Sequence, residues 1–244
     1  MRSSRFAPDR SAGRDDPLDP GPAGFAHRGL HGTGIPENSL AAFEAALALG
    51  AGIECDLRLS ADGIPLLFHD RDAVRLCGVP LVLSQSRAED ACALRLAGTT
   101  GMIPRLVELL DLVRGQVPLL LELKDERDAP RFASAVAGAL EGYSGPVGVM
   151  SFAAGVGQWL RREAPSIRRG LVLSGRDSVL RRWSKMRRAV PQFLAVKTTE
   201  LGQPWVHSAR AAMPVYSWTV RSGEERRTAR VQADAFIWEA DGRP

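Results

Sequence analysis

The feature that most constrains this fold is the alternation of short apolar runs with amphipathic helical runs after residue 22. Short apolar runs between turn signals are typical of buried strands, and apolar residues at helical spacing indicate helices packed on one face. Repeated strand-then-helix order predicts an α/β fold, here a single-domain TIM-type (β/α)8 barrel. We expect strands at residues 24–27, 52–59, 65–69, 118–123, 146–151, 169–173, 193–197, 214–220 and 235–238, and helices at 39–49, 105–113, 131–140, 154–163, 177–190, 205–213 and 224–231.

The sequence predicts nine strands, which is one more than a barrel of eight strands can hold. Asp62-Gly63 is a hairpin-type turn between two extended runs. The run at 65–69 therefore pairs antiparallel with the end of the preceding strand, or one terminal run lies outside the barrel. Residues 71–100 break the alternation, and we expect a loop with a short helix that covers the site, not a separate domain.

The first 22 residues are polar and rich in proline. We expect residues 1–22 to form a flexible arm and residues 23–244 to form the barrel domain. The arm lacks the apolar central region of a secretory signal, and no run approaches the roughly 18 apolar residues that a membrane-spanning helix needs. We therefore expect a cytoplasmic protein without stable membrane insertion. Three cysteines without CxxC spacing favour neither a zinc knuckle nor a disulfide framework.

The formal net charge is +4, and much of the positive charge falls in residues 161–169 and 176–188. Such stretches attract anionic lipid or nucleic acid, or they are solvated helix faces. We favour solvated faces, because a nucleic-acid platform interleaves aromatic side chains with its arginines, and we expect no nucleic-acid partner.

Ionisable residues stand where the apolar runs end, which in a barrel is the position of catalytic groups. They are His27 and Arg28 after the first run, Glu54, Asp56 and Arg58 on the second, His69 and Asp70 after the third, and Glu122 and Lys124 on the fourth.

Glu54 and Asp56 share one face of their strand, because side chains alternate along a strand. Carboxylates together on an interior face repel one another and lose solvation. Glu122 repeats the feature, and three carboxylates without a thiolate favour Mg²⁺ or Ca²⁺ over zinc. A buried network of carboxylates with Arg58 or Lys124 is the alternative, and we favour the metal.

His27 and His69 stand at run ends beside these carboxylates, as an acid–base pair does. His31 and His207 lie in a glycine-rich loop and a predicted helix, and we expect neither to be catalytic.

Several motifs occur in an order that resembles the glycerophosphodiester phosphodiesterase family. The resemblance runs from about residue 24 to the C-terminus, and its most specific part lies in the first half. The motifs are FAHRG at 25–29, PENS at 36–39, GAGIECD at 50–56, DG at 62–63, FHD at 68–70, LELK at 121–124, SF at 151–152 and SWTV at 217–220.

The resemblance implies a TIM-type barrel that hydrolyses a glycerophosphodiester to glycerol 3-phosphate and an alcohol. It implies that His27 and His69 are the acid–base pair, and we assign His27 as the base and His69 as the acid. It also implies that one divalent cation is held by Glu54, Asp56 and Glu122. The nucleophile is water or the neighbouring glycerol hydroxyl.

Four further positions carry expected roles. Arg28 and Lys124 match positions that face the phosphate, and Trp218 matches a position that lines the glycerol side of the pocket. Glu37 belongs to the PENS motif, and we slightly favour a role in fixing the loop over contact with the site.

The C-terminal end departs from the family pattern. Residues 236–241 read FIWEAD where the family ending resembles GIITD followed by proline, and Arg221 replaces the usual asparagine after the tryptophan motif. We expect these changes to affect substrate choice more than the reaction.

Two alternatives are kept open. The first is a lysophospholipase D or phosphoinositide-type lipid phosphodiesterase on the same barrel, for which an exposed apolar rim at the mouth would be the sign. The second is a catalytically silent barrel that binds a phosphorylated ligand or a protein partner, against which the intact set of histidines and carboxylates argues.

Overall fold

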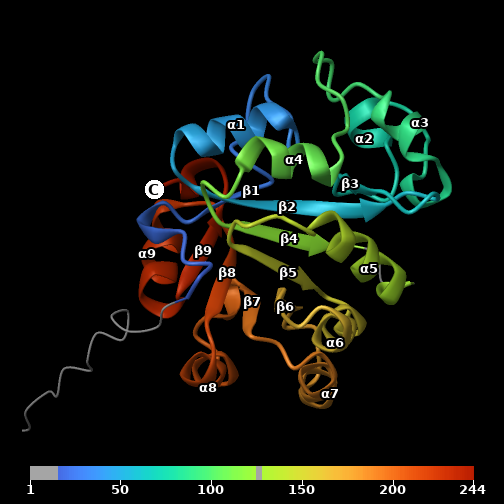
Figure 1. Cartoon of the computed structure of the whole chain (residues 1–244). Coiled ribbons are helices and arrows are strands. Elements are labelled where there is room, and N and C mark those ends of the chain that lie inside the picture. Colours follow the sequence, from blue (N-terminus) through green and yellow to red (C-terminus); the bar gives the residue numbers. More distant parts are fainter. Residues whose placement is uncertain (1–15, 125–127) are drawn as a thin grey trace, which may run out of the picture.

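The computed structural model describes residues 16–124 and 128–244. Within these residues, eight parallel strands close into a barrel, because the first strand pairs with both the second and the last (Figure 1). Helices surround the barrel, so the predicted single-domain TIM-type fold is confirmed. The barrel strands are β1 (Phe25–His27), β2 (Gly52–Leu59), β4 (Leu119–Leu123), β5 (Val147–Ser151), β6 (Arg168–Leu173), β7 (Phe193–Lys197), β8 (Val215–Val220) and β9 (Ala235–Trp238).

The predicted helices are present with shifted ends. Ser39 begins the first of them, because its side chain accepts a hydrogen bond from the amide of Ala42. Within the described part of the chain, no helix combines the length and the apolar character needed to cross a membrane. The outer helices are α1 (Leu40–Ala48), α4 (Leu106–Val113), α5 (Ala129–Ala139), α6 (Ala154–Glu163), α7 (Val179–Ala189), α8 (Pro204–Ala212) and α9 (Gly223–Gln232).

The extra strand, β3 (Pro65–Leu67), lies outside the barrel. It pairs antiparallel with the end of β2, with Leu67 opposite Leu57. The turn between them contains Gly63 at φ +85°, a left-handed conformation that glycine adopts readily. The hairpin interpretation of Asp62-Gly63 is therefore confirmed.

Residues 71–100 pack as an extension of the barrel (Figure 1). They contain α2 (Val74–Cys77), α3 (Ala88–Cys92) and a 3₁₀ turn (Leu83–Gln85), where the sequence predicted one short helix. Their small apolar core includes Leu66 and Phe68 from the β3 region. That shared core joins the segment to the barrel.

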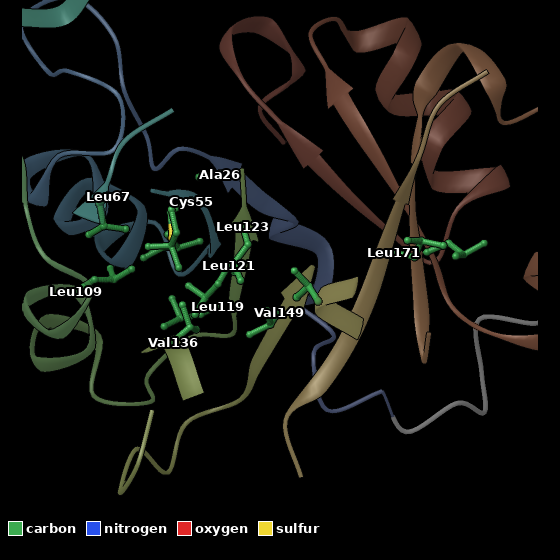
Figure 2. Close-up of a cluster of buried hydrophobic side chains, with 14 of the residues drawn as sticks. Ala26, Cys55, Leu67, Leu109, Leu119, Leu121, Leu123, Val136, Val149 and Leu171 are labelled. Atoms are coloured by element: carbon green, nitrogen blue, oxygen red, sulfur yellow. The ribbon is translucent and has the colours of Figure 1, made fainter. Parts of the chain in front are cut away.

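Alternation along the strands divides the core into two layers. Cys55 of β2 packs outward with Leu109, Leu119 and other side chains between strands and helices (Figure 2). Leu57 belongs to the same cluster. A second cluster fills the barrel interior with large rings, including Phe25, Phe193 and Tyr216. The interior is therefore filled by side chains, and the mouth at the carboxyl ends of the strands is left for the polar groups of the site.

Glycines on the strands make room for these rings. A Cβ on Gly170 would lie 2.3 Å from the ring of Phe193, and one on Gly148 would lie 2.5 Å from Leu18. No side chain fits at such distances.

Residues 1–15 of the predicted arm lie outside the described residues, and residues 16–22 are described. In its described part, Leu18 is buried in the barrel-interior cluster. Asp16 accepts a hydrogen bond from the Tyr216 hydroxyl at 2.5 Å, and its other carboxylate oxygen lies 2.8 Å from Arg168 Nη2. Residues 16–22 thus pack against the barrel. The domain boundary at residue 22 stays a prediction.

Candidate active site

The site starts from the register of three neighbouring strands. His27 at the end of β1 lies opposite Glu54 of β2, and Asp56 of β2 lies opposite Glu122 of β4. Glu54 and Asp56 are two residues apart and share the interior face, as predicted. Parallel strands end at one mouth of the barrel, so these side chains meet there.

The three carboxylates form a compact, buried cluster. Glu54, Asp56 and Glu122 each offer one oxygen, and these atoms lie within 4.8 Å of one another. Within the described residues, Asp56 Oδ1 and Glu122 Oε1 are buried without a partner of hydrogen-bond geometry. Three carboxylates this close together form a set of hard oxygen ligands, which fits a cation such as Mg²⁺ or Ca²⁺.

Burial and mutual repulsion disturb the ionisation of this cluster. Burial raises the pKa of Glu54 well above its ordinary value, and the charges of Asp56 and Glu122 raise it further. Burial likewise raises the pKa of Glu122, although Lys124 acts against it. A bound cation would remove this repulsion.

Two basic side chains enter the same cluster. Lys124 Nζ lies 3.0 Å from Asp56 Oδ1 and 2.5 Å from Glu122 Oε1, and Arg28 Nε lies 2.9 Å from Asp56 Oδ2. Burial alone would raise the pKa of Asp56, but Lys124 and Arg28 outweigh it and hold that pKa below its ordinary value. The basic network considered as the alternative to a metal is thus present through Lys124 and Arg28. Lys124 Nζ lies against the same two oxygens that lack a partner of hydrogen-bond geometry, so the ammonium group occupies the side of the cluster that a cation would also use.

His27 lies between the carboxylate cluster and the last strand. Its Nδ1 is 2.5 Å from Glu239 Oε2, and its Nε2 is 3.9 Å from Glu54 Oε2. Burial lowers the pKa of His27, and the hydrogen bond with Glu239 partly opposes this. The neutral imidazole is therefore favoured near neutral pH, a form that can accept a proton.

Glu239 is a site residue that the sequence alone did not reveal. Besides His27, it contacts Arg221 Nε at 2.5 Å and lies 3.7 Å from His31 Nε2. Both C-terminal departures from the family pattern, at 236–241 and at Arg221, therefore meet beside His27. The signal in the sequence is the departure itself, which we assigned to substrate choice.

His69, which follows β3, is held in a similar way. Its Nδ1 lies 2.7 Å from Asp70 Oδ1. Burial lowers the pKa of His69, whereas Asp56 and Asp70 raise it. Arg58 donates two hydrogen bonds to the His69 carbonyl, at 2.9 and 2.7 Å, which fixes the backbone here.

Glu37 connects this site to the segment 71–100. Its Oε1 accepts hydrogen bonds from Arg28 and from Arg75, each at 2.7 Å. Arg75 also donates to Asp70 at 2.5 Å. A chain of ion pairs thus runs from Arg28 to the partner of His69, and Glu37 both touches a site residue and fixes its loop.

Asn38 is a second residue whose role the sequence did not reveal. The side-chain Nδ2 of Asn38 donates to Asp56 Oδ2 at 3.1 Å, and its side-chain Oδ1 accepts from the backbone N–H of Asp56 at 3.0 Å. The residue has φ +54°, a left-handed conformation that asparagine tolerates. Asn38 therefore holds Asp56 in position.

Trp218 lies on the far wall of the mouth. Its ring stands edge-on to Phe152 at 5.8 Å, and Lys197 Nζ lies 5.5 Å from its centroid. Its indole Nε1 is buried and has no hydrogen-bond partner in the described residues. This wall offers apolar surface, one donor and one positive charge.

The family whose model matches this sequence is the glycerophosphoryl diester phosphodiesterase family, over residues 27–239. This chain belongs to that family. The matched range begins at His27 and ends at Glu239, which are hydrogen-bonded to each other at the ends of the neighbouring strands β1 and β9, where the barrel closes.

Named family members resemble parts of the chain. A glycerophosphodiester phosphodiesterase from Bacillus altitudinis is 36% identical over 110 residues, which cover 41% of this chain and 44% of that protein. Glycerophosphodiester phosphodiesterase domain-containing protein 4 from Macaca fascicularis is 43% identical over 70 residues, 28% of this chain and 11% of that protein. The chain thus spans less than half the length of these relatives.

Solved structures of the family share the fold. A phosphodiesterase from Oleispira antarctica, in complex with the product sn-glycerol-3-phosphate, superposes with a TM-score of 0.79 at 22% identity, over 89% of this chain and 92% of that one. A putative glycerophosphoryl diester phosphodiesterase from Silicibacter pomeroyi also gives 0.79, at 23% identity, over 92% and 93%.

Proposed function

We propose that this protein hydrolyses glycerophosphodiesters to glycerol 3-phosphate and an alcohol, with the help of one divalent cation. The observation that carries the proposal is the buried cluster of Glu54, Asp56 and Glu122 beside His27. Family membership and the product bound to the Oleispira protein support the choice of substrate.

A phosphodiester resists attack because its negative charge repels the nucleophile and its leaving alkoxide is poor. Glu54, Asp56 and Glu122 would hold Mg²⁺ or Ca²⁺, which supplies positive charge to the phosphoryl oxygens. Arg28 and Lys124 add two fixed positive charges from the protein itself. Both lie beside Asp56, so they bind the phosphate at the same place.

Proton transfer is assigned to the two histidines. His27, neutral and with Nδ1 bonded to Glu239, takes the proton of the nucleophile at Nε2. His69, in its protonated form with Nδ1 donating to Asp70, gives its Nε2 proton to the leaving oxygen. Trp218 lines the glycerol side, where its unpartnered indole N–H can donate to a glycerol oxygen.

The experiment that tests this function is release of glycerol 3-phosphate from glycerophosphocholine and glycerophosphoethanolamine, with Mg²⁺, with Ca²⁺ and with EDTA. Cation-dependent release that EDTA abolishes supports the proposal and identifies the metal. Phosphorus NMR of the same reactions shows whether a cyclic glycerophosphate forms, which identifies the glycerol hydroxyl as the nucleophile. Absence of release with either cation contradicts the proposal.

A lysophospholipase D activity is the second candidate, because three large apolar side chains are exposed on α7, which begins at the mouth of the barrel. Lysophosphatidylcholine micelles in place of glycerophosphocholine test it. Release of choline from the micelles, with no release from the soluble diester, would favour this candidate over the first.

A further inference from the structure

The N-terminal end of α7 exposes an unusual apolar surface. Val179, Leu180 and Trp183 are 71%, 79% and 58% exposed. Residues three and four apart are neighbours on a helix surface, so these side chains form one patch, which we call the α7 tip. Large apolar side chains exposed together, and not singly, mark a surface that contacts something else.

Positive charge surrounds the α7 tip. Residues 176–188 contain six arginine or lysine side chains and a single acid, Asp177. Asp177 is buried and lies 3.1 Å from Arg181 and 3.0 Å from Lys185, so its charge is neutralised locally. The guanidinium of Arg187 lies 4.6 Å from the centroid of Trp183. Positive charge therefore borders apolar side chains directly.

The α7 tip lies at the catalytic face of the barrel. β6 runs toward that face and ends at Leu173, and α7 begins at Val179 after a five-residue connection (Figure 1). In a parallel barrel, the loops that leave the strand ends share one face. The tip therefore faces the same side of the molecule as the carboxylate cluster.

We propose that the α7 tip docks on the surface of an anionic lipid bilayer. Trp183 and Leu180 enter the boundary between head groups and acyl chains, and Arg176 and Arg187 contact the lipid phosphates. This pairing matches the chemistry of a bilayer surface, which offers hydrocarbon beneath negative charge. Nucleic acid offers no hydrocarbon for Val179 and Leu180. Trp183 lies inside the basic stretch 176–188, so the premise that no aromatic side chain interleaves with these arginines was wrong, and this part of the stretch is not simply a solvated face.

Docking on this face turns the barrel mouth toward the bilayer. The contact is peripheral, made by side chains at one end of a single helix. The inference goes beyond the proposed function, because binding to vesicles requires no turnover. Failure of vesicle binding and failure of glycerophosphodiester hydrolysis can therefore be distinguished.

The experiment is co-sedimentation of the full chain with vesicles of phosphatidylcholine alone or with about one third phosphatidylglycerol, at roughly 0.1 M salt. We expect binding to the anionic vesicles and little to the neutral ones. Leu180→Ser/Trp183→Ser should lower the partition coefficient about tenfold or more. The control is Val231→Ser, because Val231 is 73% exposed at the C-terminal end of α9, on the opposite face.

A second pair of variants tests the charge. Arg176→Glu/Arg187→Glu should weaken binding about tenfold or more, whereas Arg227→Glu/Arg230→Glu on α9 changes the net charge equally and should weaken it much less. Turnover of soluble glycerophosphocholine should stay unchanged in all four variants.

Three results would overturn the proposal. One is equal loss of binding in the tip variants and the α9 controls, which indicates nonspecific charge attraction. Another is a dimer in solution that dissociates in Leu180→Ser/Trp183→Ser, which identifies the occupant as a second copy of the chain. The last is binding of an oligonucleotide, but not of anionic vesicles, that is lost in the tip variants.

Discussion

At the scale of single residues, the two histidines are held in the same way. Nδ1 of His27 meets Glu239 at 2.5 Å, and Nδ1 of His69 meets Asp70 at 2.7 Å. A carboxylate at Nδ1 orients the ring and leaves Nε2 for proton transfer. Asp70 is adjacent to His69 in the chain, so it could be noticed in the sequence, whereas Glu239 could not be connected to His27.

Glu239→Gln tests the positioning of His27. We expect kcat to fall about tenfold to a hundredfold with KM little changed. Glu239 acts against burial by raising the pKa of His27, so its loss lowers that pKa. With His27 as the base, the acid limb of the pH profile of kcat/KM then moves to lower pH. Glu239→Asp keeps the charge and should restore most of the activity, and an acid limb that stays in place in Glu239→Gln contradicts the assignment.

His69→Ala tests the proposed role of His69 in proton transfer. General acid–base catalysis contributes about a hundredfold to ten-thousandfold, so kcat should fall by that much with little change in Tm. His207→Ala is the matched control, because His207 is exposed on α8 and its replacement should leave kcat and Tm unchanged. Near-normal turnover in His69→Ala would remove this residue from the mechanism.

At the scale of elements, the sequence predicted the β2–β3 hairpin but missed one of the short helices in residues 71–100. The Asp62-Gly63 turn correctly indicated the β2–β3 hairpin, because turn chemistry depends on neighbouring residues. The helices within 71–100 were undercounted, because elements of four and five residues have no full period to detect. They are held by a shared apolar core with Phe68, which is a tertiary contact.

Gly170→Ala tests the packing of the β6 interior face. The added methyl meets the Phe193 ring, and we expect a loss of about 1–3 kcal/mol or more in the free energy of unfolding, measured with urea. Phe193→Leu in the same chain should recover part of that loss. Gly202→Ala is the control, because no atom lies within 4 Å of a Cβ there. Equal effects of the two glycine variants would contradict the packing argument.

At the scale of the whole molecule, barrel closure assembles the site. The pairing of β1 with β2 and with β9 brings His27 beside Glu54 on one side and close to Glu239 on the other. The residues of the carboxylate cluster lie on β2 and β4. These two strands are neighbours in the barrel, although the whole segment 71–100 lies between them in the chain. A cation held there would therefore stabilise the closed barrel as a unit.

Cation titration followed by Tm tests this coupling. We expect Mg²⁺ or Ca²⁺ to raise Tm, and to raise it more at pH 8 than at pH 5. Burial raises the pKa values of Glu54 and Glu122, so protons compete with the cation at low pH and leave as it binds. Glu122→Gln should show a smaller rise in Tm. No rise at saturating cation and pH 8 would remove the metal from the proposal.

The sequence by itself determined the strand-and-helix order and the side of each strand on which a residue lies. Both follow from periods of two and 3.6 residues, which are properties of the local backbone. This is why Glu54, Asp56 and Glu122 could be grouped from their positions in the chain alone.

Only the tertiary structure decided which distant residues complete the site. Glu239 lies 212 positions after His27 and reaches it through closure of the barrel, and Asn38 reaches Asp56 from the loop before α1. Such contacts depend on how whole elements pack in three dimensions, and no local period encodes them. The same holds for the α7 tip, because a helix pattern shows its apolar side chains but not which of them the barrel leaves uncovered.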